Sequence, residues 1–464
     1  MKTIFFLWCD YCWLMSNPKK WWETSLLITL KFQIKKKKMK TKQTFLLQIL
    51  AIAALTISCN TPNEPVNNSL TLSAEVSCTE VWLKLSANNV SLPKGITITR
   101  DGNNLFSFTL TTKDTTLYDS TLAPNKSYTY QAIINPIGGQ SDKVVATTLD
   151  TTSHNFSWQT YTFGDARVGS STLYDVSIVN DTLAYAAGEI YLSDSTGESN
   201  QTPYCLARWN GKNWHFIRLK FFPPGSGGDS LNAIGSAVFA NNKDDIWLSA
   251  GTVFHYDGNR WTAYYNMLGA EGATKIWSDG KGNVWFVGRN GLIINYSNGS
   301  LHKIESGTSV DIQDIWGTDN EGRQTIMCSA SNVASGGEHK ILKINGNKVE
   351  QVEWVNSRRT HSIWFDDSNS IFSCGGGVYI KKHRNWIEQT SLPLTYTRRV
   401  RGNAKNDVFV VGDFGLVGHY NGTNWKTYPE AAQGIFYSMD YKKGIMVATG
   451  GSDNAILLVM KKLK

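Results

Sequence analysis

The sequence lacks the short motifs on which many enzymes depend. It contains no His-Glu-x-x-His zinc helix, no Gly-x-Ser-x-Gly nucleophile elbow and no phosphate-binding loop. Its seven cysteines show no metal-ligand spacing, and the pair Cys9 and Cys12 lacks the βαβ context of a redox motif. We therefore expect no catalytic residue, no bound metal and no cofactor.

A net charge is also missing from most of the chain. The formal charge is +8, but residues 1–58 hold ten lysines, no arginine and two acids, so the remainder is neutral. A nucleic-acid partner requires a basic surface that neutralises phosphates. No such partner is expected.

The beginning of the chain has the pattern of an export signal. Basic residues open the segment 39–58, and the apolar run 45–57 is too short for a comfortable membrane span. The segment leads through LTIS to Cys59, which resembles a bacterial lipoprotein signal. The resemblance implies a signal peptide at 39–58, a lipid anchor on Cys59, a tether at 59–69 and an outer-membrane location. Residues 1–38 fit no such signal, and we interpret them as a leader or a mis-assigned start.

A small domain is predicted at 70–152, where short strands alternate with turns in a stretch long enough for one β-sandwich. The segment LAPNKSYTY, Leu122–Tyr130, resembles the fibronectin type III family, in which a Leu-x-Pro and a following tyrosine form a corner. The resemblance implies a spacer or an adhesive unit. A plain structural stalk is the alternative.

Residues 155–464 are imperfect copies of one unit, seen most clearly at Lys275–Glu305. Each copy holds four short runs of β-branched and aromatic residues within about 40 residues, which is typical of a β-propeller blade. Two-residue hairpin turns require positive φ angles and favour Asn-Gly or Asp-Gly. These dipeptides occur at Asn210-Gly211, Asp257-Gly258, Asn298-Gly299, Asn345-Gly346 and Asn421-Gly422, and one further copy has Lys382-His383 at the same place.

The last copy begins near Gly434 and supplies only three strands. An unpaired strand, Phe156–Phe163, precedes the first copy. We predict that it completes the last unit, because this closure removes free strand edges. The predicted fold is all-β, a fibronectin-like sandwich followed by a seven-bladed propeller. The phrases NVWFVGRNGLIINY and DVFVVGDFGLVGHYNGTNW resemble the propeller repeats of periplasmic two-component sensors.

Other repeated residues have structural interpretations. Trp277, Trp316 and Trp364 recur at the end of the first strand, which predicts packing between blades. His255 and His419 recur before a hairpin turn, and we interpret them as tolerated surface residues. Four cysteines of the exported part are either buried thiols or two disulfides, and these are Cys78, Cys205, Cys328 and Cys374.

The candidate binding site is basic. Residues on the first strands of two successive blades, or just before them, are expected to meet on the face that carries the loops between blades. Guanidinium groups there can grip carboxylate or phosphate groups. The alternative is that the arginines are solvated and paired with local acids. The candidate residues are Arg358, Arg359, His361, Arg398, Arg399 and Arg401.

These observations favour an exported, lipid-anchored binding or assembly module of the bacterial cell envelope. Its ligand would be a glycan or an envelope protein, held at the loop face. The alternative is a glycan-active enzyme, a lyase or glycosidase, because propellers host such chemistry and fold alone does not exclude it. The sequence does not indicate an oligomeric state.

Overall fold

The computed structural model confirms an all-β chain. Residues 69–464 form one compact unit, and the predicted signal peptide, tether and Cys59 lie outside the described residues. Besides strands, this part contains two short 3-10 turns, η2 (Arg289–Gly291) and η3 (Asp413–Gly415). No helix of the described part is long and apolar enough to cross a membrane. The described residues are 69–136, 138–193, 202–223, 225–265, 267, 272–320, 322–332, 337–354, 357–367, 369–431 and 433–463.

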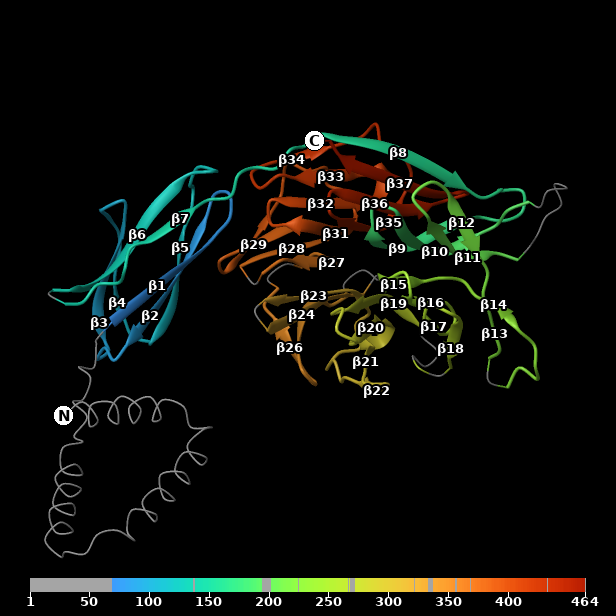
Figure 1. Ribbon diagram of the computed structural model, residues 1–464, viewed down its shortest axis with the longest axis horizontal. Helices are drawn as coiled ribbons and strands as arrows, with labels where there is room; N and C mark the ends of the chain where they lie inside the picture. The colour runs from blue at the N-terminus through green and yellow to red at the C-terminus, as the bar shows by residue number, and fades with distance from the viewer. Residues whose placement is uncertain are drawn as a thin grey trace, which may run out of the picture. The chain divides into compact units, whose positions relative to one another are not determined.

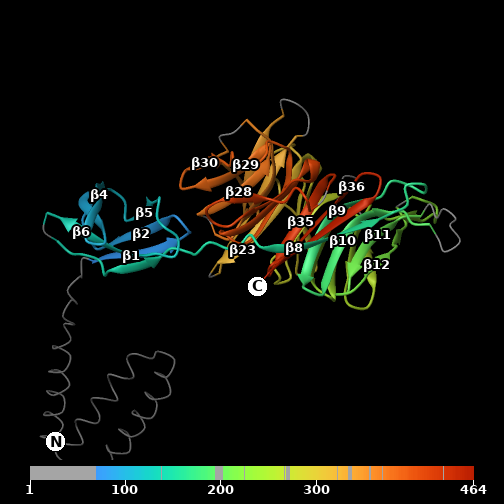
Figure 2. The same cartoon turned by 90° about the horizontal axis from the view of Figure 1, so that it is seen from above.

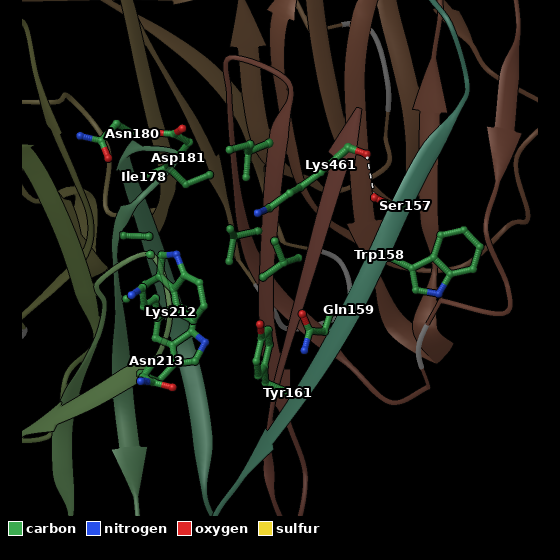
Figure 3. Close-up of a pocket in the computed structure, with 17 residues that line it drawn as sticks. Ser157, Trp158, Gln159, Tyr161, Ile178, Asn180, Asp181, Lys212, Asn213 and Lys461 are labelled. Atoms are coloured by element: carbon green, nitrogen blue, oxygen red, sulfur yellow. Dashed lines mark hydrogen bonds between the residues drawn. The ribbon is translucent and has the colours of Figure 1, made fainter. Parts of the chain in front are cut away.

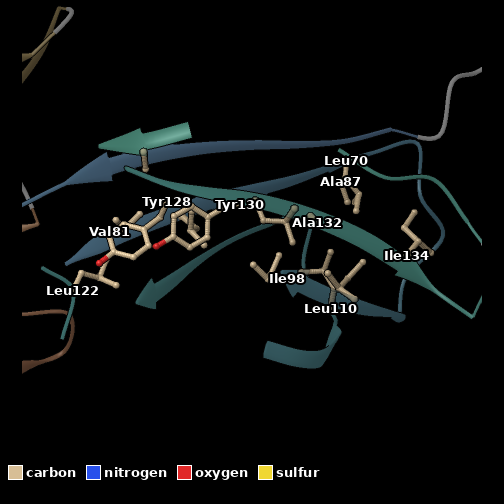
Figure 4. Packing of buried hydrophobic residues seen from close by; sticks show 14 residues of the cluster. Leu70, Val81, Ala87, Ile98, Leu110, Leu122, Tyr128, Tyr130, Ala132 and Ile134 are labelled. Carbon is tan, nitrogen blue, oxygen red and sulfur yellow. The ribbon is translucent and has the colours of Figure 1, made fainter. Parts of the chain in front are cut away.

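The first seven strands form two antiparallel sheets, ordered β1-β2-β5 and β4-β3-β6-β7. Both sheets contribute to one hydrophobic core, which includes Val81, Ile98 and Tyr130 (Figure 4). The backbone N–H of Ala123 donates to the Tyr128 hydroxyl at 3.0 Å, so this tyrosine pins the turn before β6. The strands are β1 (Ser69–Val76), β2 (Val81–Asn88), β3 (Lys94–Arg100), β4 (Asn103–Leu110), β5 (Asp114–Asp119), β6 (Ser127–Asn135) and β7 (Val144–Thr147).

Seven four-stranded antiparallel sheets follow, numbered here in chain order. Sheet 1 contains β9 (Thr172–Asn180), β10 (Leu183–Ile190), β11 (Tyr204–Trp209) and β12 (Trp214–Ile217). Sheet 2 contains β15 (Ala237–Asn242), β16 (Asp245–Ser249), β17 (Val253–Tyr256) and β18 (Trp261–Tyr264). Sheet 3 contains β19 (Ala273–Ser278), β20 (Val284–Gly288), β21 (Ile293–Ser297) and β22 (Ser300–Lys303). A separate two-stranded sheet, β13 (Lys220–Phe221) and β14 (Leu231–Asn232), lies between sheets 1 and 2 in the chain.

Sheets 4 to 7 complete the set. Sheet 4 contains β23 (Ile312–Asn320), β24 (Arg323–Ser331), β25 (His339–Asn345) and β26 (Lys348–Val352), and sheet 5 contains β27 (Thr360–Phe365), β28 (Ser370–Gly375), β29 (Gly377–Lys382) and β30 (Asn385–Glu388). Sheet 6 contains β31 (Thr397–Ala404), β32 (Asp407–Gly412), β33 (Val417–Tyr420) and β34 (Trp425–Thr427). Sheet 7 contains β35 (Phe436–Lys442), β36 (Ile445–Gly451), β37 (Ala455–Lys462) and β8 (Phe156–Phe163).

The sheets are arranged in a ring. The first strand of each sheet contacts the first strand of the next, and β35 of sheet 7 contacts β9 of sheet 1. Figure 2 shows these two sheets side by side. Each sheet therefore buries both faces against its neighbours, which a single sheet of this size cannot do alone.

Strand β8 closes the last sheet. It pairs antiparallel with β37 from Phe156 opposite Lys462 to Phe163 opposite Ala455 (Figure 1). This is the pairing predicted for the strand Phe156–Phe163. The two ends of the ring are thus held by one continuous ladder of backbone hydrogen bonds.

The predicted hairpin turns are present where the dipeptides stand. Gly211, Gly258, Gly299, Gly346 and Gly422 all have positive φ angles. In the copy without glycine, His383 adopts a φ of 55°. The turn geometry is therefore kept even where the residue type is less suited to it.

The repeated tryptophans pack between sheets, as predicted. The indole of Trp277 lies against Gly317, and that of Trp364 lies against Gly402. Trp316 donates from Nε1 to the carbonyl of Phe365 at 2.9 Å. Each ring covers the first strand of the following sheet, so these residues stabilise the ring.

Candidate functional site

The centre of the ring contains a network of buried charges. One equivalent register position of the first strands carries both acids and bases, because side chains at this position point inward in every sheet. The residues at this position are Asp175, Ala237, Lys275, Asp314, Ser362, Arg399 and Ser438.

The charged side chains of this network lie in ion pairs. Lys275 Nζ lies 2.5 Å from Asp175 Oδ1. Asp314 accepts from two Arg401 nitrogens at 2.7 and 2.8 Å and lies 2.6 Å from Arg399 Nη1. Burial disfavours the charged Asp314, but Arg399 and Arg401 outweigh this and hold its pKa below the usual range. Two aspartates thus hold three basic side chains in the buried centre.

This network corrects the prediction for two of the candidate arginines. Arg401 is 2% exposed and Arg399 is also buried, so neither belongs to an exposed basic surface. Both side chains point to the ring centre because they are two residues apart on β31. The alternative stated from the sequence, solvated arginines paired with local acids, does not describe these two residues either, because both are buried and their partner Asp314 lies on another sheet.

Arg398, which directly precedes Arg399 in the chain, points the other way. It lies at the register shift between Thr397 and Arg399, near the start of β31 and therefore toward the end of the ring that carries the loops between sheets. Arg398 Nε donates to Asp413 Oδ1 at 2.5 Å, and the guanidinium lies 4.8 Å from the ring centre of Tyr437. The side chain remains 23% exposed. Unlike Arg399 and Arg401, it is therefore partly open to solvent.

Phe414 follows Asp413, the ion-pair partner of Arg398, in the turn η3. Its side chain is 85% exposed, and its φ angle is 57°. The equivalent residue in η2 of sheet 3 is Asn290, with a φ of 52°. Asparagine tolerates the left-handed region, whereas a bulky residue there is an outlier that suggests a function. The sequence prediction did not include Phe414. A comparison of the equivalent segments RNG of η2 and DFG of η3 would have indicated it, because phenylalanine replaces asparagine at the residue with positive φ.

A second exposed apolar side chain belongs to the same loop face. Leu394 is 74% exposed and precedes β31. The backbone N–H of Asp413 donates to the carbonyl of Tyr396 at 2.9 Å, which ties η3 to the segment that carries Leu394. We call Leu394, Tyr396, Arg398 and Phe414 the loop-face patch.

His361 lies at the edge of the patch. Its Nδ1 is 3.1 Å from the Tyr396 hydroxyl. Burial lowers the pKa of His361 to about 3, and the positive charges of Arg399 and Arg398 act in the same direction. The imidazole is therefore neutral near pH 7 and cannot hold an anion by charge. Its place among the candidate ligand-binding residues stays a prediction.

The remaining candidates, Arg358 and Arg359, precede β27. Arg358 Nη1 lies 3.2 Å from Glu388 Oε1 and donates to the carbonyl of Gly376 at 3.3 Å. The carbonyl of Arg359 accepts from the N–H of Gly376 at 2.9 Å. Arg358 is thus held by local partners.

We expect His361 to make stability depend on pH. Its pKa is about 6.5 when unfolded and is lowered in the folded chain, so the unfolded state binds more protons between these values. Stability should therefore fall by about 1–2 kcal/mol between about pH 7 and about pH 5. The variant His361→Gln should lack this pH-dependent contribution. The measurement is the free energy of unfolding in urea at both pH values, for the variant and the wild type. The exposed His302→Gln is the control, and equal slopes in wild type and His361→Gln would contradict the assignment.

The two repeated histidines are not merely tolerated on the surface. His419 is fully buried, and its Nε2 lies 2.8 Å from Asp407 Oδ1. The Nε2 of His255 lies 2.8 Å from Asp245 Oδ1, and its ring stacks on an indole. Each histidine is a structural partner of the aspartate that opens the second strand of its sheet.

The cysteines and possible metal ligands do not form a reactive site in the described part. Its four cysteines are buried free thiols, which resolves the alternative of disulfides. Burial raises the pKa of Cys205 to about 11 and that of Cys374 to about 12, so both are unreactive near pH 7. No cluster of three or more His, Cys, Asp or Glu in this part is placed to hold a metal ion.

Comparison with known proteins identifies the architecture. The structure of YCF48 bound to D1 peptide is similar, with a TM-score of 0.50 and 14% identity over 68% of this chain and 97% of that chain. The WD40 β-propeller domain of Doa1 has a TM-score of 0.48 and 13% identity, covering 67% of this chain and 98% of its own. No protein-family model and no curated protein matches the sequence. At this identity the likeness shows the fold alone, which is of the β-propeller type.

Proposed function

We propose that the protein is a non-enzymatic binding or assembly module that holds a protein segment at the loop-face patch. The observation that carries this proposal is Phe414, an aromatic side chain that is almost fully exposed on a backbone held at positive φ. Such a conformation is unfavourable for phenylalanine. A contact with a partner gives a reason for keeping this residue there.

The chemistry around Phe414 supports a protein partner. Protein-binding hot spots are rich in aromatic residues and arginine, with apolar neighbours that exclude water. Arg398 lies between the rings of Tyr396 and Tyr437, at 5.2 and 4.8 Å from their centres, so the guanidinium is pre-oriented. Preorganisation lowers the entropy that binding would otherwise cost. The peptide in the YCF48 structure agrees with this type of partner.

The acids at the loop face support binding over catalysis. Glu189 accepts a hydrogen bond from the Tyr174 hydroxyl at 2.8 Å, and Asp413 is paired with Arg398. A general acid in glycan cleavage needs a carboxyl whose pKa is raised. Among the described residues, burial raises the pKa of Asp366, which follows β27 at the opposite, hairpin end of its sheet.

The wider proposal is an exported lipoprotein of the bacterial outer membrane, anchored through Cys59. Its ring would be a seven-bladed propeller, supported by the seven sheets and the closing strand β8. The domain at 70–152 would be fibronectin type III-like, supported by its two sheets and by the hydrogen bond between Ala123 and Tyr128. In this arrangement the sandwich and tether hold the ring away from the membrane.

The test is binding of the full chain to an array of purified envelope proteins and glycans, with product analysis for every glycan. We expect at least one protein to bind, and Phe414→Ala to weaken it by about tenfold or more. Arg398→Ala should weaken the same interaction. Val145→Ala, at an exposed apolar residue of β7, is the control. Binding unchanged by Phe414→Ala, or release of shorter or unsaturated sugars, would overturn the proposal.

A further inference from the structure

A groove of about 610 Å³ lies between sheets 1 and 7, at the seam where the ring closes. Three aromatic side chains, Tyr161, Trp209 and Trp214, form part of its lining. The centres of these rings lie 5.4 to 6.2 Å apart. Figure 3 shows Tyr161 on the side of the groove formed by sheet 7, while Trp158 of the same strand points away from it.

The walls of the groove are sheet faces. Backbone groups of β8 and β37 pair with each other, and those of β11 and β12 do likewise. β8 and β12 are the outermost strands of their sheets, but the groove lies between the faces of the two sheets, and these faces present side chains. The groove therefore selects a ligand that aromatic faces and side-chain hydrogen bonds can recognise. Pyranose sugars have both the apolar ring face and the hydroxyl groups for this.

The polar rim adds hydrogen-bonding groups and positive charge. Asn180, Asp181 and Asn213 are exposed there and can both accept and, through their amides, donate to hydroxyl groups. Lys212 and Lys461 are also exposed, and no ion pair occupies either ammonium group within the described part of the chain. Figure 3 shows Lys461 extending across the groove toward sheet 1. Two ammonium groups against one carboxylate favour an anionic ligand.

The neighbouring groove between sheets 1 and 2 provides an internal comparison. It measures about 360 Å³ and is lined by Trp261, which pairs with Tyr256 as Trp214 pairs with Trp209. Its lysine, Lys243, already lies 2.6 Å from Asp244. This second groove is smaller and is lined by one ion-paired lysine and by Arg208, whereas the seam groove is lined by two lysines and three aromatic rings.

We propose that the seam groove binds an acidic oligosaccharide, a chain of uronic acid units. The pyranose rings stack on Trp214, Trp209 and Tyr161, while Lys212 and Lys461 bind the carboxylates. The amides of the rim bind the hydroxyl groups. This site is separate from the loop-face patch, so the protein can hold a glycan and a protein at the same time.

The test uses the full chain and calorimetric titration with tetramers of galacturonate, mannuronate and guluronate, and with maltotetraose as a neutral probe. At least one acidic tetramer should bind one-to-one, with affinity that falls as salt is added. The double variant Lys212→Ala/Lys461→Ala should lower this affinity by about tenfold or more. Both residues are exposed, so the fold is not at risk. Trp214→Ala should have a similar effect, whereas the matched Trp261→Ala should have none.

Each other outcome opposes the proposal. Failure of all acidic tetramers to bind, equal binding of maltotetraose, or affinity unchanged by the lysine double variant would overturn it. Phe414→Ala should leave tetramer binding intact. Failure of this inference is therefore distinguishable from failure of the proposed function, in which Phe414→Ala must lower binding of a protein.

Discussion

Asp314→Ala is expected to lower the free energy of unfolding by about 3–5 kcal/mol, the typical cost of removing one partner from a buried ion pair. The aspartate accepts from Arg401 through both oxygens and lies against Arg399, all three side chains being buried. Its loss leaves two guanidinium groups facing each other in the ring centre without a counter-charge. The measurement is denaturant unfolding of the variant and wild type at the same pH.

The control for this prediction is Asp319→Ala. Asp319 is ion-paired with Lys281 near the end of the same strand, but the lysine is largely exposed. An exposed pair contributes at most about 1 kcal/mol. Adding Arg399→Met and Arg401→Met to Asp314→Ala should recover part of the loss, because no buried charge is then left unpaired. A cost for Asp314→Ala no greater than that of the control would show that water reaches the centre.

Gly450→Ala is expected to cost about 3 kcal/mol or more, because a methyl group there meets backbone that cannot move aside. The added Cβ would lie 1.8 Å from the carbonyl oxygen of Ile435 and 3.0 Å from the Cα of Phe436. The register shift at the start of β35 brings this carbonyl against β36. Thermal unfolding of the variant measures the loss.

The same close approach recurs around the ring. A Cβ added at the equivalent glycine of four other sheets would also lie within 2.5 Å of a carbonyl oxygen, and these are Gly188, Gly288, Gly375 and Gly412. Gly95→Ala is the control, since a Cβ there meets only ordinary contacts at 3.6 Å or more. If Gly450→Ala were no more destabilising than Gly95→Ala, the carbonyl of Ile435 would have to move without cost.

The repeat could be read from the sequence because its signals are local. Strand alternation and hairpin turns depend on neighbouring residues, and the positive φ angles at Gly211 and Gly258 follow directly from Asn-Gly and Asp-Gly. The closing strand was also accessible, since Phe156–Phe163 had no partner among its neighbours and the last unit lacked one strand. Repetition itself located Trp277 and Trp364 between sheets.

The candidate site was only partly accessible. Arg398, Arg399 and Arg401 are close in the chain, yet one is partly open to solvent and two lie in the buried centre. Strand alternation turns Arg398 away from Arg399 and Arg401, but only the fold shows that the side chains of Arg399 and Arg401 face the buried centre. Aligning Asp314 with Arg399 across the repeats would have found the shared register position. The exposure of Phe414 required the backbone conformation of η3.

By itself the sequence determined the all-β architecture, the repeated unit and its turns, because alternation and φ preferences act within a few residues. Only the tertiary structure decided which charges meet and which side chains remain open. Asp314 and Arg401 are 87 positions apart, and closure of the ring brings them together. The seam groove likewise exists because β8, from the start of the ring, lies beside the last strand. Ring closure and register are global properties, so the functional surfaces emerge only when every sheet is in place.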